Sequence, residues 1–477
     1  MVNEEQMAMI GERVEHPTFG RGELVAMFDG GRRWFVRFER GNVGLLLPRQ
    51  GFLHTKALSA PDREPKPLAA RVVRPQPAVR TQFEARQLIE TLRLGVVPTQ
   101  FMREMTIGID KERTSLVMAL NQTEQKGGAV RVVIGEYGVG KSHIVEWTAQ
   151  EALTRGFLVA NTSLDLLELP PHRAFDIYSQ LMCNLRYPDA ETRGIRPLLD
   201  KIARQPHIIT RYHALTQVKW DPIAMTLDIF QHVGSSLQHN TWAAWLQGGP
   251  RAKRMNALLP PNVKFPTLYK SGHNMRQLAY LLGGISTLAQ LVNYKGLCIL
   301  LDEAESYSLL QRNKRPKADL FFQSMIYAAL RHHQSYIQPH LLPQHRHRDY
   351  PAAFEQQQAL FFLFTVTHSE NNLPLHQWLD NSQLLYLAPY YTPRQLSTFL
   401  QHVLNYHSQA YNYEPATRHR QIRRAAAEHL AWGIRYHRLS VRGLVRLAVE
   451  LFDLLYLHEE FEVVRLISEL RQQMRGM

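Results

Sequence analysis

The segment from Gly135 to Ser142 contains the residue types that bind a phosphate chain. It matches the pattern G-x-x-x-x-G-K-[ST] and consists of Gly135, Glu136, Tyr137, Gly138, Val139, Gly140, Lys141 and Ser142. Phosphates bind against backbone N–H groups at the start of a helix, so side chains must be absent where the backbone approaches the ligand. In such a loop the lysine reaches the β- and γ-phosphates, and the serine hydroxyl ligates Mg²⁺. We therefore expect ATP and Mg²⁺ as ligands, with Lys141 in catalysis and Ser142 at the metal.

The flanking residues distinguish this loop from a glycine-rich turn of no function. The apolar run 129–134, "AVRVVI", precedes the loop, and "HIVEWTAQEAL" follows it with apolar residues at helical spacing. A strand before the loop and a helix after it are the context that a phosphate-binding loop requires. The alternative, a bare match without function, is disfavoured by this context.

An acidic pair after a second apolar run supplies what hydrolysis would need in addition. In "GLCILLDEAES", residues 297–301 predict a strand, and Asp302 and Glu303 follow it. We expect Asp302 to hold Mg²⁺ and Glu303 to orient and polarise the attacking water. The alternative is an acidic pair that stabilises a helix N-terminus. Together with the loop, the pair favours an active ATPase over a GTP-type switch.

Two further residues are candidates for contact with the phosphates. The strand "ALFFLFTVTHSE" ends in Thr365, Thr367, His368 and Ser369, of which Thr367 is predicted to touch the γ-phosphate or the attacking water. A threonine that only caps the strand is the alternative. Arg442, in "LSVRGLVRLAVEL", begins an amphipathic helix and is predicted to fold back on the phosphates, the alternative being a surface arginine. An arginine finger for a neighbouring subunit would come from Arg331, Arg346 or Arg348.

Four short apolar runs predict the sheet that positions these residues. They cover residues 129–134, 156–161, 296–301 and 359–366, and such runs are typical of strands buried on both faces of a parallel sheet. The long separation between Lys141 and Asp302 predicts a largely helical insertion at about 165–285, a candidate surface for a partner or for DNA. After Tyr390 the sequence indicates helices to the end. The fold class is therefore α/β, with a P-loop core and a helical C-terminal lid.

The first residues predict a separate small domain. Short β-rich runs alternate with Asp29-Gly30-Gly31 and Gly41-Asn42, which are hairpin signals. We expect an SH3-like or tudor-like β-barrel over 1–58 and a proline-rich extended linker over 59–82, because dense prolines continue neither a helix nor a central strand. The ATPase core then covers 83–390 and the lid 391–477.

Composition bears on partners and compartment. The formal net charge is +14 and the sequence pI is about 9.7, which favours a polyanion such as DNA as a partner, although a basic, soluble surface is the alternative. Cys183 and Cys298 are the only cysteines, so neither a disulfide framework nor a zinc site is expected. The sequence shows neither a signal-peptide pattern nor an apolar run long enough to span a bilayer. These features predict a cytoplasmic protein without a membrane partner.

Several segments together resemble a known family. "RQLIETLRLGVVP", "TIGIDKERTSLVMAL", "VVIGEYGVGKSHIVEWTAQEALTRGFLVANTSLD", "ELPPHRAFDIYSQLM" and "LLDEAESY" resemble the BrxC/BrxD-like ATPases of BREX phage-defence systems, most closely the BrxD type, over about 83–450. The resemblance implies an AAA+-like additional-strand ATPase with a helical lid that forms homo-oligomers. It implies phosphate-loop roles for Lys141 and Ser142 and an acidic pair at Asp302 and Glu303. It also adds His143 to the loop, and Ile107 and Gly108, in a turn that packs on adenine.

The N-terminal residues resemble a second family. Residues 11–47, with the H-P-x-F-G-x-G signature, are similar to the tudor-like C-terminal module of UvrD/PcrA-type helicases, which is associated with docking onto proteins or nucleic acid. The BREX resemblance implies a helicase or nuclease of the same locus as a partner. The sequence thus predicts an anti-phage ATPase that couples ATP hydrolysis to oligomeric assembly on DNA. The alternatives are a nucleotide-gated adaptor with little turnover and a DNA-binding regulator in which the basic charge is primary.

Overall fold

The computed structural model divides into two units, Met1–Arg74 and Pro75–Met477. The first is described in its four strands. The second is described over 77–458 and at 465 and 472, except for 99–100, 217, 220, 233–235, 250–254, 256–267, 269–274, 332–334, 344–349, 355, 357, 368–372, 389 and 437–438.

The described residues of the N-terminal unit form an antiparallel sheet. Its strands are β1 (Arg13–His16), β2 (Gly20–Phe28), β3 (Arg33–Phe38) and β4 (Gly44–Pro48), which pair in chain order. The register shifts between Leu24 and Ala26, which marks a bulge in β2. The strands predicted around the two glycine-containing turns are present, whereas the turns lie outside the described residues. Closure into a barrel and the tudor-like assignment stay predictions.

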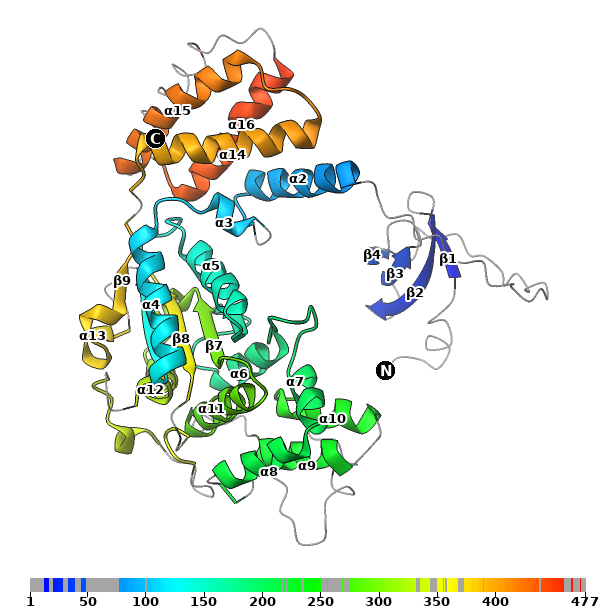
Figure 1. Ribbon diagram of the computed structural model, residues 1–477, viewed down its shortest axis with the longest axis vertical. Coiled ribbons are helices and arrows are strands. Elements are labelled where there is room, and N and C mark those ends of the chain that lie inside the picture. The colour runs from blue at the N-terminus through cyan, green and yellow to red at the C-terminus, as the bar shows by residue number, and fades with distance from the viewer. Residues whose placement is uncertain are drawn as a thin grey trace, which may run out of the picture. The chain divides into compact units, whose positions relative to one another are not determined.

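The described part of the second unit contains a five-stranded parallel sheet in the order β6-β7-β8-β5-β9, shown in Figure 1. The strands are β5 (Ala129–Ile134), β6 (Leu158–Ser163), β7 (Leu297–Asp302), β8 (Leu360–Val366) and β9 (Leu384–Tyr386). All four predicted strands and the parallel α/β class are confirmed. Strand β9 was not predicted, since it spans only three residues. Strand β8 lies between β5 and β7 and pairs with both in parallel. This order matters most for the arrangement of the site.

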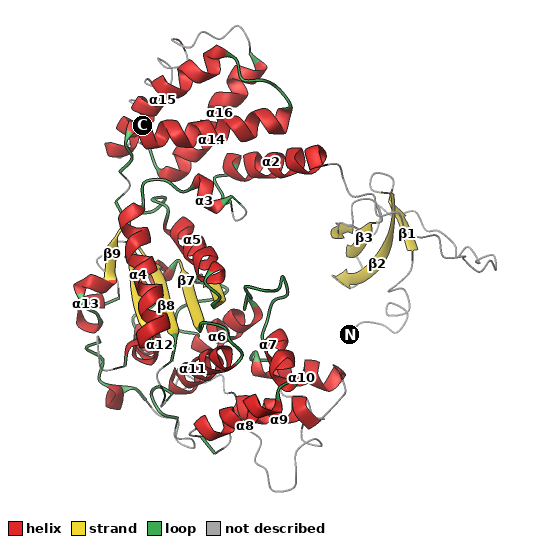
Figure 2. Cartoon of the chain, viewed as in Figure 1, coloured by secondary structure: helices red, strands yellow, loops and turns green. Residues whose placement is uncertain are grey.

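Alternate residues of these strands enter two different apolar clusters, as the period of two in a strand requires. Along β7, Ile299 packs into one cluster and Leu300 into the other. The face of Leu300 is covered by α4 (Asp110–Lys126) and α5 (Lys141–Thr154). The face of Ile299 is covered by α6 (Ala174–Cys183), α11 (Met275–Leu291) and α12 (Arg315–Leu330). Figure 2 shows the resulting layers of helix, sheet and helix.

A set of helices is inserted between β6 and β7. Helices α6 and α11 bracket it, and between them lie α7 (Arg196–Ala203), α8 (Pro206–Leu215), α9 (Pro222–His232) and α10 (Ser236–Leu246). Their buried side chains belong to the same apolar cluster as one face of the sheet, so the insertion is anchored in the core. None of the described helices, the strongly buried α11 included, has both the length and the hydrophobicity that a membrane crossing requires.

The C-terminal region is helical, as predicted. It contains α14 (Pro393–Tyr411), α15 (Thr417–Arg435) and α16 (Val441–Leu457), and α2 (Pro77–Arg93) packs with them in a third apolar cluster. Helix α2 begins at Pro77, so residues 77–82 are helical and not extended, contrary to the prediction. A proline is accepted in the first turn of a helix because the N–H that it lacks has no partner there. Short elements join these parts: α3 (Met102–Met105), η4 (Ala304–Leu309), η5 (Pro339–Leu341), α13 (Leu375–Trp378) and η6 (Asn381–Gln383).

A polar network inside the helical region ties α2 to α14 and α16. The guanidinium of Arg93 forms an ion pair with Asp453, and His407 Nε2 lies 3.0 Å from Asp453 Oδ1. His407 Nδ1 is hydrogen-bonded to Tyr413 Oη at 2.8 Å, and the His407 side chain is fully buried. Burial alone would raise the pKa of Asp453, but the hydrogen bonds and positive charges of His407 and Arg93 lower it below its usual value.

We expect Asp453→Asn to lower the free energy of unfolding by about 2 kcal/mol, since it leaves the half-buried guanidinium of Arg93 without its counter-charge and weakens the hydrogen bond to His407. The pKa of Asp453 is lower in the folded state than in the unfolded chain. The carboxylate therefore stabilises the fold fully above pH about 4, and this contribution is lost as the pH falls below that value. Urea unfolding at pH 7 and at pH 3.5 measures both effects. Glu450→Gln, at an exposed position of the same helix, is the control and should change little.

Candidate nucleotide-binding site

The phosphate loop connects β5 to α5 and starts at the carboxyl end of β5. Gly138 has φ +78° and Gly140 has φ +104°, a backbone conformation that glycine adopts without steric cost. A Cβ atom at Gly140 would meet no atom within 4 Å, so this glycine faces open space and is required by backbone conformation alone. The loop thus has the conformation that its glycine spacing predicts.

The start of α5 fits an anionic ligand. Among the described residues, none accepts a hydrogen bond from the backbone N–H groups of Lys141, Ser142 or His143. These are the donors that a helix N-terminus leaves without partners inside the helix. They suit a phosphate because the partial positive charge of the helix terminus adds to their hydrogen bonds.

Lys141 is buried beneath the loop, with its side chain only 7% exposed. Its ammonium donates to the carbonyl oxygens of Gly135 and Glu136 at 3.0 and 3.1 Å and to Thr367 Oγ1 at 2.8 Å. The same nitrogen lies 3.7 Å from Glu305 Oε1. An ammonium has three protons to donate, so a phosphate that binds Lys141 must replace at least one of these acceptors.

The acidic pair lies at the end of β7, where Asp302 is the last residue of the strand, and is organised by the neighbouring strand β8. Thr365 Oγ1 donates to Asp302 Oδ1 at 2.6 Å and accepts from the N–H of Glu303 at 3.0 Å. Glu303 has φ +56° and ψ +35°, an uncommon conformation for a residue with a Cβ atom and one that is concentrated at functional sites. Ser163 Oγ, at the end of β6, donates to Glu303 Oε2 at 3.0 Å. Three adjacent strands therefore position this pair.

Thr365 and Ser163 were not assigned a role from the sequence. A signal existed for Thr365, because it is the single polar side chain inside the buried strand β8 and is itself 0% exposed. A buried hydroxyl requires a hydrogen-bond partner, and the acidic pair provides it. Thr367, the residue that was singled out, lies two positions further and contacts Lys141 instead. His368 and Ser369 lie outside the described residues.

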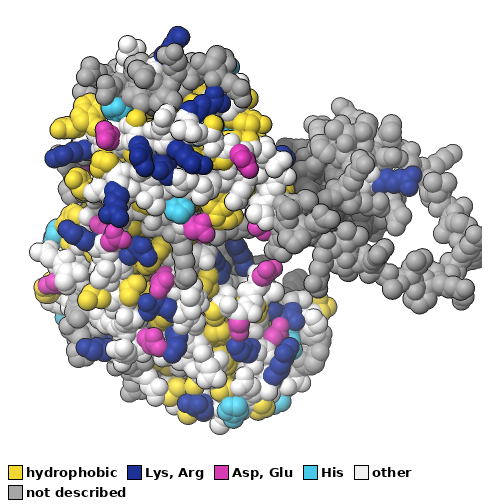
Figure 3. All heavy atoms as spheres, turned by 45° about the horizontal axis from the view of Figure 1, so that its top comes forward, with side chains coloured by type: hydrophobic (Ala, Val, Ile, Leu, Met, Phe, Trp, Pro, Cys, Tyr) yellow, Lys and Arg dark blue, Asp and Glu magenta, His cyan; other side chains and the backbone are white. Residues whose placement is uncertain are grey.

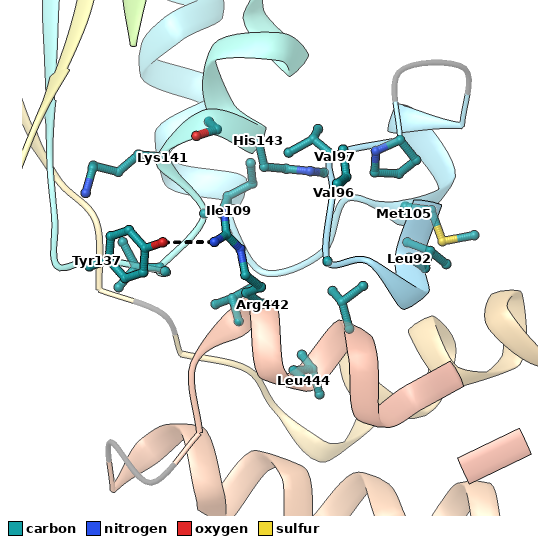
Figure 4. Close-up of a pocket in the computed structure, with 18 of the residues that line it drawn as sticks. Leu92, Val96, Val97, Met105, Ile109, Tyr137, Lys141, His143, Arg442 and Leu444 are labelled. Carbon is teal, nitrogen blue, oxygen red and sulfur yellow. Dashed lines mark hydrogen bonds between the residues drawn. The ribbon is translucent and has the colours of Figure 1, made fainter. Parts of the chain in front are cut away.

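A pocket extends from the loop between the sheet and the helical region. One end contains the polar residues of the loop and the acids, and the other end is apolar. Figure 4 shows Lys141 and Tyr137 at one end, Val96, Val97 and Met105 at the other, and Ile109 between them. The apolar side chains are Leu92, Val96, Val97, Pro98, Met105, Ile107, Ile109, Val139, Tyr391, Phe399, Val441, Leu444 and Val445. A pocket with an apolar end and a phosphate-binding end suits a nucleotide.

The turn predicted to pack on adenine lies at this apolar end. Ile107 and Ile109 line the pocket, whereas Gly108 does not. Gly108 has φ +70°, and a Cβ atom there would lie 2.4 Å from Cδ1 of Tyr391. The glycine thus permits a close contact with Tyr391, which is buried and itself lines the pocket. The residues from 92–98 and from α16 that complete the apolar end were not predicted.

Helix α16 begins directly on the phosphate loop. The N–H of Val441 donates to the carbonyl oxygen of Gly138 at 3.1 Å, and the Ser440 side chain caps the helix by accepting from the N–H of Gly443 at 3.1 Å. Arg442 lines the pocket and donates through Nη1 to Tyr137 Oη at 2.9 Å, the contact drawn in Figure 4. The structure therefore places Arg442 beside the loop, with its guanidinium bound to a loop residue.

His143 lines the same pocket in the first turn of α5. Its Nε2 lies 2.7 Å from Thr106 Oγ1, and that hydroxyl donates to the carbonyl oxygen of Met102 at 2.5 Å. Because the threonine proton is used on Met102, Nε2 must be the donor to Thr106. Burial lowers the pKa of His143 to about 4. The imidazole is therefore neutral at pH 7, and its other nitrogen is an acceptor.

Of the three candidate finger arginines, the structure describes Arg331. Its guanidinium donates to the backbone carbonyl oxygens of Phe354 and Gln356 in the same chain. Arg346 and Arg348 lie outside the described residues. Arg331 is thus engaged within its own chain.

The site contains oxygen ligands of the kinds that bind Mg²⁺ beside a phosphate chain. Ser142 offers an exposed hydroxyl at the start of α5, and the carboxylate of Asp302 lines the same pocket. Hydroxyl and carboxylate oxygens are the protein ligands that Mg²⁺ accepts together with phosphate oxygens. Ser142 and Asp302 would hold the ion.

Comparison with known proteins agrees with the site at its phosphate-binding end. Residues 81–207 match the family model described as BREX system ATP-binding protein BrxC/D. The matched range begins in α2 and ends in α8, so it contains the phosphate loop but not the acidic pair. No curated protein matches the chain. The similarity thus supports ATP binding, while the likeness to the BrxD type in particular stays a prediction.

We expect the free energy of unfolding to decrease as the pH is lowered from about 6.5 to about 4. The cause is His143, whose pKa differs between the folded and the unfolded chain. The pKa of His143 is about 4 in the fold and about 6.5 in the unfolded chain. Between these values only the unfolded chain binds the proton, so stability decreases as the pH falls, by at most about 3 kcal/mol.

Urea unfolding at pH 7.0 and pH 4.5 tests this expectation with His143→Gln, which removes the titrating group. The loss between the two pH values should be smaller in this variant than in the wild type. His207→Gln, at an exposed position of α8, is the matched control and should keep the wild-type loss. An equal loss in wild type and His143→Gln would contradict the assignment.

Proposed function

We propose that this protein is a Mg²⁺-dependent ATPase of an anti-phage defence system of the BREX type. One observation carries the proposal: Asp302 and Glu303 end a strand that is separated from the phosphate-loop strand by β8 alone. Residues of β8 and of the segment directly after it contact both sides, since Thr365 binds the acidic pair and Thr367 binds Lys141. Binding and hydrolytic groups are therefore adjacent.

Each residue has a distinct task in this proposal. Backbone N–H groups at the start of α5 and the ammonium of Lys141 bind the β- and γ-phosphates. Glu303 accepts a proton from the attacking water and orients it, while Thr367 contacts the γ-phosphate or that water. Mg²⁺, held by Ser142 and Asp302, would supply positive charge against the charge that develops on the phosphate oxygens. Arg442 would add a second positive charge after leaving Tyr137.

In this proposal, the present contacts of three site residues would restrain turnover. Glu303 is hydrogen-bonded to Ser163, Lys141 to its own loop, and Arg442 to Tyr137. Each of these groups must exchange a protein partner for nucleotide or water before it acts. Such exchange needs a differential interaction with the ligand-bound state, which a partner molecule or a neighbouring subunit would provide.

We further propose that ATP binding and hydrolysis drive assembly on DNA as a homo-oligomer, together with a helicase or nuclease of the same defence locus. The positive net charge of +14 supports a polyanionic partner. Particle mass measured with ATP and DNA, for the protein alone and with products of neighbouring genes, tests the assembly. A mass that stays that of one chain under all these conditions would contradict it.

Glu303→Gln should retain ATP binding and lose at least about 100-fold in turnover, because the amide cannot accept the proton from water. Lys141→Ala should instead lose ATP binding, since it removes the charge that meets the phosphates. Steady-state phosphate release with and without duplex DNA measures turnover, and a fluorescent ATP analogue measures affinity.

The outcome separates two functions. If the wild type shows no turnover above Glu303→Gln in any DNA condition but binds ATP, the protein is a nucleotide-gated adaptor and the ATPase proposal fails. If neither the wild type nor Glu303→Gln binds ATP, the nucleotide site itself is refuted.

Thr365→Val should lower turnover about tenfold or more while ATP affinity changes little, because the hydroxyl positions Asp302 and Glu303 without lining the pocket. Thr365→Ser keeps the hydroxyl and should restore most of the rate. The same assays apply, and thermal unfolding reports any loss of stability. Equal turnover in the valine and serine variants would show that the hydroxyl has no positioning role.

A further inference from the structure

The outer face of α15 carries positive charge that the described residues do not neutralise. Helix α15 contains Arg418, Arg420, Arg423, Arg424 and Arg435 against the single acid Glu428. Arg420, Arg424 and Arg435 are exposed. None of the three forms an ion pair with a described residue, and Glu428, exposed on the same face, forms none either. Figure 3, in which the C-terminal helices come forward, shows groups of Lys and Arg side chains on this part of the surface, with few Asp and Glu.

The arginines are close enough to repel one another. Arg423 lies between Arg420 and Arg424 in sequence and donates to the side chain of Gln401 on α14. Its Nε has no hydrogen-bond partner among the residues that the structure describes. Burial first, and then the positive charges of Arg424 and Arg420, lower the pKa of Arg423 below its usual value. Such crowding costs stability unless an anion binds there.

Two aromatic side chains extend the same face toward the C-terminal end of the helix. Trp432 is 42% exposed and Tyr436 is 55% exposed, and their ring centroids lie 5.1 Å apart. Positions 420, 424, 432 and 435 lie on one side of an α-helix, because residues spaced by three or four positions share a face. The arginines and the aromatic pair therefore form one surface, about 18 Å long from Arg420 to Trp432 at 1.5 Å per residue.

We propose that this surface, formed by Arg420, Arg424, Trp432, Arg435 and Tyr436, binds a single-stranded nucleic acid. Arginines neutralise phosphates, and exposed rings stack on bases that are free of a duplex. A duplex offers phosphates but keeps its bases stacked on one another, so it would leave the rings unused. The inference rests on the proposed function only in naming nucleic acid as a partner; it assigns the site and the strandedness.

The charge contribution is tested with Arg420→Gln/Arg424→Gln, since glutamine is also a good helix former. Binding of a labelled single-stranded DNA oligonucleotide of mixed sequence is measured by anisotropy at several NaCl concentrations. Loss of two phosphate contacts should make the slope of log K against log[salt] shallower by about 1.4 and weaken binding roughly 25-fold at 0.1 M salt. The matched control is Arg204→Gln/Arg211→Gln, two exposed arginines of the helical insertion, which should bind like the wild type.

The ring contribution is tested with Trp432→Ala, which should weaken single-strand binding about fivefold or more, and with Trp432→Phe, which should retain most of the affinity. The same oligonucleotide annealed to its complement should bind independently of Trp432. The proposal is overturned if the wild type binds no single strand, if the insertion variant weakens binding equally, or if Trp432→Ala has no effect.

Two readouts keep this proposal separate from the ATPase proposal. Affinity for a fluorescent ATP analogue and phosphate release without DNA should be unchanged in all the α15 variants. Normal ATP turnover without single-strand binding refutes the surface and leaves the ATPase. Single-strand binding that requires Arg420 and Arg424, in a protein without turnover, supports the surface and refutes the ATPase.

Discussion

The buried ammonium of Lys141 is the constraint on which the rest of the site depends. A positive charge that is only 7% exposed is stable only when hydrogen-bonding partners surround it. Those partners come from separate segments: two carbonyl groups of the phosphate loop, the hydroxyl of Thr367 after β8, and the carboxylate of Glu305 in η4. One charge thus requires the loop, the end of β8 and the segment after the acidic pair to converge. These contacts hold the three segments together until a phosphate replaces some of the groups that bind the ammonium of Lys141.

The strand order makes this convergence possible. Because β8 lies between β5 and β7 and all three are parallel, their carboxyl ends meet at one edge of the sheet. Thr365 and Thr367 are two residues apart, so they project in the same direction, and one reaches the acidic pair while the other reaches Lys141. The central strand therefore joins the binding and hydrolytic halves of the site through two hydroxyl groups.

Most of this sheet was predictable from the sequence, because strands buried on both faces are continuous apolar runs. The phosphate loop and the acidic pair were also predictable, because their chemistry allows only a few residue types at each of several adjacent positions. The apolar end of the pocket was not predictable, because it joins Val96 and Val97 to Leu444 from the opposite end of the chain. That α2 packs against the C-terminal helices was not predictable either. The spacing of apolar residues indicates which face of a helix is buried, but it does not indicate which element covers that face. Strand β9 is too short to produce a pattern.

Helix α16 connects the nucleotide pocket to the proposed surface on α15. Its first residues contact the phosphate loop through Val441 and Arg442, and its buried side chains share an apolar cluster with α15. Packed helices move together, because interiors as dense as crystals do not deform continuously. A ligand on the proposed α15 surface would act on nucleotide binding through this packing if it favoured one position of α16 relative to the loop. Linkage would then require that ATP change the affinity for that ligand by the same factor, which would make the helical region a coupling element as well as a wall of the pocket.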